Sequence, residues 1–132
     1  MLALLQRRPL LFVGVLAADV AADLLADGVK DAVPRARPHV SHLVALPSSG
    51  SFPSGHAATS FACATVLAAA VPRGRVAFGL LAAAIAYSRL YNGVHYPLDV
   101  LAGAALGVLV GLTARRLPAA RRRGSRRGWR AG

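Results

Sequence analysis

Apolar residues are gathered into four runs along the chain, and most polar residues lie in the segments between these runs. The runs cover about residues 9–29, 54–71, 76–91 and 97–113. The first has roughly the twenty residues that an α-helix needs to cross a bilayer. The pattern therefore predicts an all-α fold, an integral-membrane bundle of about four transmembrane helices.

The ends of the chain differ from these runs. We expect residues 1–113 to form one membrane-embedded core, and residues 114–132 to form a basic tail that is cytoplasmic and disordered. The basic head before the first apolar run also fits a signal peptide, which is the rival interpretation of that run. Lys30 follows the run directly, and for that reason we favour a retained helix.

Three aspartates interrupt the first run at every fourth position, which places them on one helix face. They are Asp19, Asp23 and Asp27. A carboxylate near the bilayer centre costs about 2.5 to 3.5 kcal/mol on insertion scales, so this face is predicted to point into the bundle. Asp27 can pair with Lys30, three residues further on. A proton or cation path along this face is the alternative to structural pairing.

The fourth run has small residues at the same spacing. Gly103, Gly107 and Gly111 follow Asp99 at intervals of four. Small residues at this spacing allow helices to pack closely in lipid. The helix face that carries Asp99 is therefore predicted to turn into the bundle.

Composition supports a membrane protein. The chain is 55% hydrophobic with a mean hydropathy of +0.49, which is too apolar for an ordinary soluble domain, yet its formal net charge is +11. The charges must therefore be separated from the apolar runs. Cys63 is the only cysteine, so the chain cannot form an internal disulfide; it lies within an apolar run.

The cations are divided unequally between the two ends of such a bundle. Four lie at one end: Lys30, Arg35, Arg37 and Arg89. Twelve lie at the other: Arg7, Arg8, Arg73, Arg75, Arg115, Arg116, Arg121, Arg122, Arg123, Arg126, Arg127 and Arg130. Positive charge marks the cytoplasmic side. We therefore expect a multi-pass protein of the cell (plasma) membrane, with both termini cytoplasmic and the first end on the periplasmic or extracellular side.

The arginine-rich tail has two interpretations. A nucleic-acid-binding patch is one. A polybasic segment beside the membrane, bound to anionic lipid headgroups, is simpler, and we favour it. No nucleic-acid partner is expected.

Candidate chemistry lies between the third and fourth runs, where Arg89, His95 and Asp99 are close in sequence. A histidine can attack phosphorus if a neighbouring acid holds its ring in the right tautomer. An arginine supplies a fork of donors for phosphoryl oxygens. The plainer interpretation is that Arg89 and Asp99 pair at a helix junction, with His95 in a loop.

A second group of polar residues lies at the start of the second run. Ser54 fits a helix N-cap, and the free N–H groups of a first helical turn favour anions. Ser54, Gly55 and His56 would thus present a hydroxyl, close backbone and an imidazole to one phosphate. In the long polar connection before them, Arg35, His39 and His42 could add headgroup contacts, although solvated loop residues are the interpretation we favour. No pattern there supports a metal site.

Three segments together resemble the signature of the type 2 phosphatidic acid phosphatase superfamily, which contains lipid phosphate phosphatases and shares its anion site with vanadium haloperoxidases. They are Lys30 with Arg37 and Pro38, then Pro53 to His56, then Ser88 and Arg89 with His95 and Asp99. Order, spacing and residue type match between residues 30 and 99. The family also places this lysine at the end of a transmembrane helix.

The resemblance implies roles for these residues. His95 would be the nucleophile that forms a phosphohistidine, Asp99 would orient and activate it, and His56 would protonate the leaving group. The phosphoryl oxygens would be bound by Lys30, Arg37, Ser54, Gly55 and Arg89. No cofactor and no metal is implied.

The function expected is that of an integral-membrane lipid phosphatase, acting on a phosphate monoester or diphosphate of a membrane lipid, with a polyprenyl phosphate favoured. Phosphatidic acid or phosphatidylglycerophosphate is the alternative substrate. A non-catalytic membrane module and a haloperoxidase relative are the alternatives of another class. Many bacterial relatives have six membrane helices, whereas this chain has room for four. Smaller four-helix relatives act on polyprenyl-linked phosphates, so four helices can form a complete core; the alternatives are a fragment of a longer chain and a homodimer that covers the missing surface.

Overall fold

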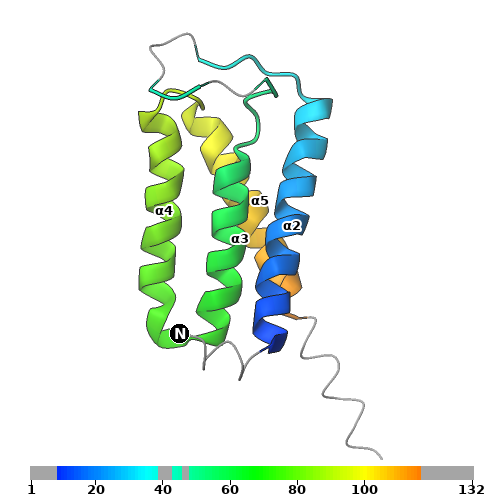
Figure 1. Cartoon of the computed structure of the whole chain (residues 1–132), viewed down its shortest axis with the longest axis vertical. Helices are drawn as coiled ribbons and strands as arrows, with labels where there is room; N and C mark the ends of the chain where they lie inside the picture. Colours follow the sequence, from blue (N-terminus) through cyan, green and yellow to red (C-terminus); the bar gives the residue numbers. More distant parts are fainter. Residues whose placement is uncertain (1–8, 39–42, 46–47, 117–132) are drawn as a thin grey trace, which may run out of the picture.

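The computed structural model describes residues 9–38, 43–45 and 48–116. Within them the secondary structure is helical and contains no strand, which confirms the all-α prediction. Four α-helices form a bundle (Figure 1): α2 (Pro9–Ala32), α3 (Gly55–Ala70), α4 (Arg75–Tyr91) and α5 (Pro97–Ala114), with a 3-10 turn η1 (Pro72–Gly74) between α3 and α4.

The helix ends follow local sequence signals. The helix α2 continues to Ala32, three residues beyond the expected end, and it stops before Val33, the residue that precedes Pro34. A residue before proline is disfavoured in the helical conformation. Pro97 begins α5, where its missing N–H is not needed. The Asp99 carboxylate accepts the Tyr96 N–H at 2.9 Å and so caps this helix.

Two helices are long and apolar enough to cross a membrane, namely α2 and α5, while α3 is a shorter apolar helix of 16 residues. Large apolar side chains are exposed along α2, among them Leu10, Phe12, Leu16, Val20 and Leu24. A continuous apolar surface of this kind is rare on a soluble monomer. In a bilayer it faces lipid, and the fold is that of a membrane-embedded helical bundle.

The helix α3 occupies the centre of the bundle and packs against the other three (Figure 1). On α5 it meets the small-residue face: a Cβ added at Gly103 or Gly107 would overlap the carbonyl oxygen of Ser54 or Ala58, respectively. A Cβ added at Gly111 would lie 2.6 Å from Thr65 Cβ and 2.8 Å from the carbonyl oxygen of Ala62. The predicted close packing of this face is therefore confirmed.

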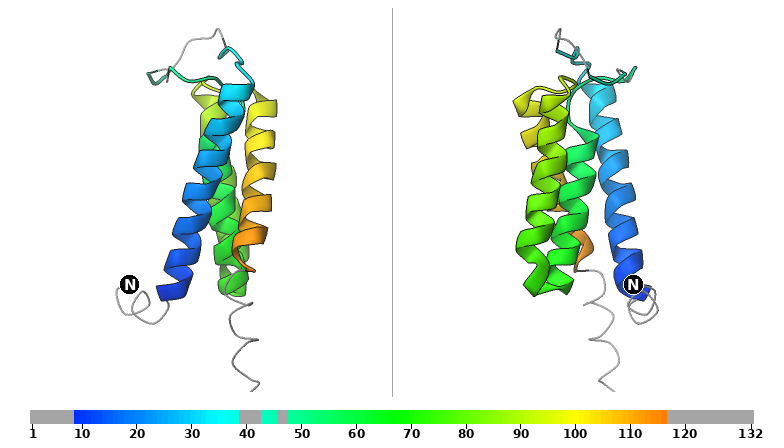
Figure 2. Two further views of the ribbon diagram at one scale, coloured as in Figure 1. Left: turned by 90° about the vertical axis from the view of Figure 1, so that its right-hand side faces the viewer. Right: turned by 60° about the vertical axis from the view of Figure 1, so that its left-hand side comes forward.

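The helices alternate in direction, so segments far apart in the sequence meet at one end. The end of α2, the start of α3, the end of α4 and the start of α5 lie together there, with the connections between them above (Figures 1 and 2). Pro9, η1 and Ala114 lie at the opposite end. We call the first the loop end. It gathers the residues that the sequence singled out for chemistry.

Candidate active site

A cavity of about 420 Å³ opens at the loop end. Most of the predicted site residues line it: Lys30, Arg37, Gly55, His56, Arg89 and His95. The remaining lining residues are Asp19, Asp23, Val44, Ala45, Ser49, Thr59 and Val94. The two other predicted residues, Ser54 and Asp99, are fully buried at the starts of α3 and α5. All of the predicted site residues thus belong to one end of one bundle.

His95 lies in the turn between α4 and α5 and is only 7% exposed. Its Nδ1 lies 2.7 Å from the carbonyl oxygen of Ser51. Because a carbonyl only accepts, Nδ1 carries the proton and donates it, and Nε2 of the neutral ring keeps a free lone pair. Burial lowers the pKa of His95, and nearby Arg37 and Lys30 lower it further, whereas the Ser51 carbonyl and Asp99 oppose the shift. The imidazole is therefore neutral and nucleophilic at neutral pH.

Asp99 has a different set of partners from the one expected. Its Oδ1 accepts a hydrogen bond from the Arg35 guanidinium at 2.8 Å, and its Oδ2 accepts the Tyr96 N–H. The distance from Oδ2 to His95 Nδ1 is 3.8 Å, which is too long for a hydrogen bond. The sequence predicted that Asp99 would orient the His95 ring, but the atom that accepts the Nδ1 proton of His95 is the carbonyl oxygen of Ser51. Asp99 acts on His95 through its charge.

Three cations line the cavity, and each retains donors. Lys30 Nζ donates to Asp27 at 2.7 Å, which confirms the predicted pair, and an ammonium has two further N–H groups. Arg89 donates from two nitrogens to the Ser88 hydroxyl. A guanidinium has five N–H groups, so Arg89 also has donors left for an anion.

Arg37 has a structural task in addition to the expected one. Its guanidinium donates to the carbonyls of Ser49, Gly50 and Val94, at 3.2, 3.2 and 2.9 Å. These bonds join the segment before α3 to the turn that carries His95. Two of its five N–H groups remain for a ligand.

The start of α3 offers neutral donors. The Ser54 hydroxyl is completely buried and has no hydrogen-bond partner among the described residues, and it does not cap the helix. The Ser54 N–H donates to the Asp99 carbonyl oxygen at 2.9 Å, which fixes α3 against α5. A buried hydroxyl without a partner costs free energy, so this atom is suited to a ligand. Gly55 and His56 follow it on the cavity wall.

The prediction that the aspartate face of α2 points into the bundle holds only in part, because the buried face of α2 carries Ala18, Ala22 and Ala26, and Asp27 is exposed. Asp19 and Asp23 line the inner part of the cavity, and Asp19 accepts a hydrogen bond from the Cys63 thiol at 3.7 Å. Among the described side chains no three His, Cys, Asp or Glu residues are close enough together to hold a metal ion. His39 and His42, named above for headgroup contacts, lie outside the described residues.

Two residues of this end were not identified from the sequence. Arg35 was interpreted as a solvated loop residue, and Ser51 was not singled out. Ser51 is fully buried, and its hydroxyl donates to the Ala36 carbonyl at 3.1 Å. Their partners Asp99 and His95 are 64 and 44 residues away along the chain, so no local pattern marks them.

This arrangement defines a class: a membrane-embedded helical protein that gathers three cations around a cavity at one end of the bundle, beside a neutral histidine. The chain belongs to the PAP2 superfamily, whose family model matches residues 9–123. The resemblance drawn from the sequence motifs is thereby confirmed.

Known proteins of this family are similar to the chain. It is 44% identical over 68 residues to a lipid A 1-phosphatase of Porphyromonas gingivalis, covering 48% of this chain and 15% of that protein. It is 44% identical over 62 residues to an undecaprenyl-diphosphatase of Sulfolobus acidocaldarius, covering 46% and 30%. With a decaprenylphosphoryl-5-phosphoribose phosphatase of Mycobacterium tuberculosis the identity is 42% over 74 residues, covering 56% and 41%.

A solved structure shares the fold. The transmembrane PAP2-type phosphatidylglycerolphosphate phosphatase of Bacillus subtilis is 29% identical, with a TM-score of 0.71 over 80% of this chain and 58% of that one. The chain spans less than half the length of the curated relatives described above. The family model and the solved structure establish the family and the fold of this chain, and the activities of the relatives support the proposal that follows.

Proposed function

We propose that the protein is an integral-membrane phosphatase, which hydrolyses a phosphate monoester or diphosphate of a membrane lipid through a phosphohistidine on His95. One observation carries the proposal: a neutral imidazole with a free Nε2 lies in the same cavity as three cations that keep N–H donors. A phosphoryl group placed there would meet the nucleophile and its counter-charges together.

In the first step Nε2 of His95 attacks phosphorus, and the bond from phosphorus to the leaving oxygen breaks. His56, at the cavity wall on α3, gives the leaving oxygen a proton. Lys30, Arg37 and Arg89 neutralise the charge on the phosphoryl oxygens, where a loose transition state spreads it. The attacked ring becomes positive, and the Asp99 charge 3.8 Å from Nδ1 stabilises it.

In the second step water attacks the phosphohistidine and gives its proton to His56. The phosphorus–nitrogen bond breaks, inorganic phosphate leaves, and His95 and His56 return to their first states. The proton that departs with the leaving group in the first step is therefore replaced in the second step by a proton from water. The backbone of Gly55 borders the phosphoryl oxygens in the cavity, and the Ser54 hydroxyl, which is buried directly behind it without a partner among the described residues, would reach them only if its side chain turned towards the cavity.

The substrate is proposed at the level of a lipid class. The relatives described above act on different lipids, according to their names, and the shared element of those names is a phosphate on a membrane lipid. We favour a polyprenyl phosphate or diphosphate. A phosphatidylglycerophosphate is the second candidate, since the similar solved structure is a phosphatase of that kind; phosphatidic acid belongs with it.

We also propose the placement of the molecule. The loop end would face the periplasm or exterior of the plasma membrane, with four crossings and both termini in the cytoplasm. Residues 114–132 would contact anionic lipid headgroups. A homodimer would cover part of the exposed apolar surface of α2, which includes Leu16 and Leu24.

The test is phosphate release by the purified protein in detergent, with chelator and no added metal. Polyprenyl diphosphate, a polyprenyl monophosphate ester, phosphatidylglycerophosphate and phosphatidic acid are compared. We expect release from at least one lipid and a loss of about 10⁴-fold or more in His95→Ala, because the nucleophile is gone. His56→Ala should lose about 10²- to 10⁴-fold, the usual contribution of a general acid.

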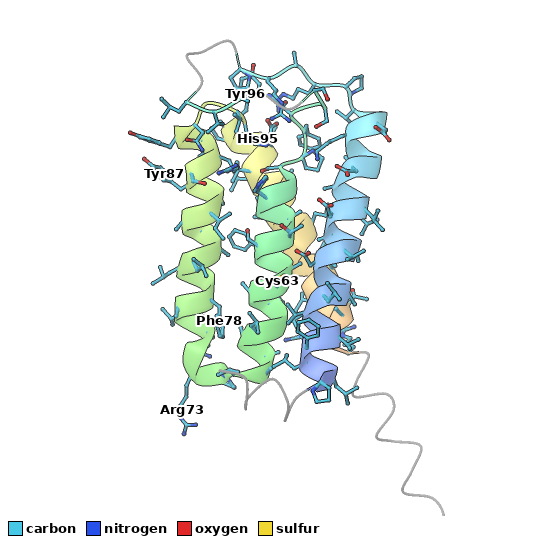
Figure 3. All side chains as sticks on the ribbon, viewed as in Figure 1. Cys63, Arg73, Phe78, Tyr87, His95 and Tyr96 are labelled. Atoms are coloured by element: carbon cyan, nitrogen blue, oxygen red, sulfur yellow. The ribbon has the colours of Figure 1, made fainter. Side chains whose placement is uncertain are left out.

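Controls make the test specific. Arg89→Ala should lose activity and Arg73→Ala should not, because Arg73 lies at the opposite end of the bundle (Figure 3). Rapid quenching with ³²P-labelled substrate should trap an acid-labile phosphoenzyme in the wild type and none in His95→Ala. Equal rates in the wild type and His95→Ala would refute the nucleophile, and a folded wild type that releases no phosphate from any lipid would refute the activity.

A further inference from the structure

Arg35 lies in the segment after α2, among the six residues that separate Lys30 from Arg37. Its guanidinium donates to Asp99 Oδ1 at 2.8 Å, and its Cζ lies over the Tyr96 ring at 4.4 Å from the centroid. Figure 3 shows Tyr96 and His95 together at the loop end. Arg35 thus holds residues on both sides of the start of α5, next to the histidine.

The backbone of Arg35 makes a second connection to the same histidine. Its carbonyl accepts the Ser51 N–H at 2.9 Å, and the Ser51 carbonyl in turn accepts the proton of His95 Nδ1 at 2.7 Å. The two groups that border Nδ1, a carbonyl and a carboxylate, are therefore both attached to Arg35. Apart from His95 itself, no other described residue is shown to contact both Ser51 and Asp99.

The charge of Arg35 decides whether the Ser51 carbonyl or the Asp99 carboxylate has the stronger effect on His95 Nδ1. Asp99 is completely buried, and a buried carboxylate without a cation is strongly destabilised. Without Arg35, the nearest ring able to supply a positive charge is His95, 3.8 Å away. With Arg35 in place, the guanidinium offsets part of the carboxylate charge, and the Ser51 carbonyl is the acceptor of the ring proton.

We propose that Arg35 is a positioning residue for His95, which fixes the tautomer and orientation of the nucleophile through Asp99 and Ser51. Arg35 does not line the cavity, so it contacts the partners of the nucleophile and leaves the phosphoryl oxygens to the cations that do. The proposal rests on the proposed function of His95. It gives different roles to two arginines that are two residues apart: Arg37 lines the cavity and binds the phosphoryl group, whereas Arg35 contacts Asp99 and does not line the cavity.

The test removes the charge of Arg35 and keeps a polar side chain with an N–H donor. Arg35→Gln retains a donor for Asp99 but leaves the carboxylate charge uncompensated, whereas Arg35→Lys restores the charge. The ring of His95 is followed by ¹⁵N NMR of histidine-labelled protein in detergent, and kcat/KM is measured against pH on one lipid. Other charged groups that face His95 stay constant across the variants: Lys30 on α2, Arg37, His56 on α3, Arg89 on α4, and Asp19 and Asp23 on α2.

In Arg35→Gln the pKa of His95 should rise by about one unit, since an uncompensated carboxylate within about 4 Å favours the charged imidazole. The acid limb of kcat/KM should move to higher pH by the same amount, and kcat should fall more than KM rises. Arg35→Lys should keep the wild-type pKa. Arg35→Gln combined with Asp99→Asn should return the pKa towards that of the wild type, because the charge that shifted it is gone.

An unchanged pKa of His95 in a folded Arg35→Gln protein would overturn the proposal. If Arg35→Gln does not fold, Arg35→Lys decides: a shifted His95 pKa there, with the charge preserved, would equally overturn it. The ¹⁵N titration needs no substrate. It therefore tests Arg35 even if the wild type releases no phosphate, which would be a failure of the proposed function alone.

Discussion

The imidazole of His95 is subject to opposing influences from its neighbours. Burial and the cations Arg37 and Lys30 favour the neutral ring, while the Ser51 carbonyl and Asp99 favour the charged one. The first group prevails, and the pKa of His95 is lowered. A nucleophile of this kind stays active at a lower pH than an ordinary histidine would, because only its neutral form has a free lone pair.

The tautomer and the pKa of His95 can be measured directly. In ¹⁵N-histidine spectra at neutral pH, Nδ1 of His95 should carry the proton and Nε2 should not. As the pH falls, the ring should become protonated only below about 6.5, the ordinary value for histidine. The His95→Gln protein assigns the signal. A ring protonated on Nε2 at neutral pH would contradict the hydrogen bond to Ser51.

The site residues that could be predicted from the sequence and those that could not differ in what determines their position. The motif residues Lys30, His56 and His95 are placed by the ends of apolar helices, and the hydropathy pattern locates those ends. Arg35 and Ser51 depend on the fold of the long connection between α2 and α3. Their bonds to Asp99 and His95 join residues 64 and 44 positions apart, and no periodicity encodes such contacts.

At the scale of elements, the site depends on how closely α3 approaches α5. The helix α3 carries Ser54 and His56 at its start, and α5 carries Asp99 at its start. The glycines of α5 allow the two backbones into contact, so that the Ser54 N–H reaches the Asp99 carbonyl oxygen at 2.9 Å. The sequence predicted this face from glycine spacing, because close packing in a membrane requires small residues.

Adding one methyl group at this interface should separate the helices. Gly107→Ala would place a Cβ against the Ala58 carbonyl and 3.0 Å from the Ala62 nitrogen. Overpacking of this kind costs about 1 to 3 kcal/mol, and the melting temperature in detergent should fall. Activity should fall as well, because the starts of α3 and α5 would move apart.

Gly79→Ala is the matched control on α4, where a Cβ would meet nothing within 4 Å. Since alanine is the better helix former by about 0.8 to 1 kcal/mol, this variant should be as stable as the wild type or more so. Equal melting temperatures for the two alanine variants would show that the α3–α5 contact is not as tight as the glycines indicate.

At the scale of the molecule, the bundle separates its charges along its length. Lys30, Arg35, Arg37 and Arg89 lie at the loop end, while Arg73 and Arg75 lie at the other end, where α2 begins and α5 stops. The remaining arginines precede α2 or follow α5 in the sequence, and these two helix ends lie at that second end. The cations of the loop end form ion pairs or line the cavity. Among the described residues, neither Arg73 nor Arg75 forms an ion pair, and neither lines that cavity. An excess of positive charge without such a site is typical of a cytoplasmic face.

This asymmetry predicts the orientation, and single cysteines can test it. In a Cys63→Ala background, Ser48→Cys places a thiol at the exposed loop end and Arg73→Cys places one at the exposed opposite end. A membrane-impermeant maleimide added to intact bacterial spheroplasts should label the first, and should label the second only after the membrane is permeabilised. The reverse labelling would place the cavity in the cytoplasm, where it would meet lipids of the inner leaflet. Labelling of both without permeabilisation would mean that the charge difference does not fix one orientation.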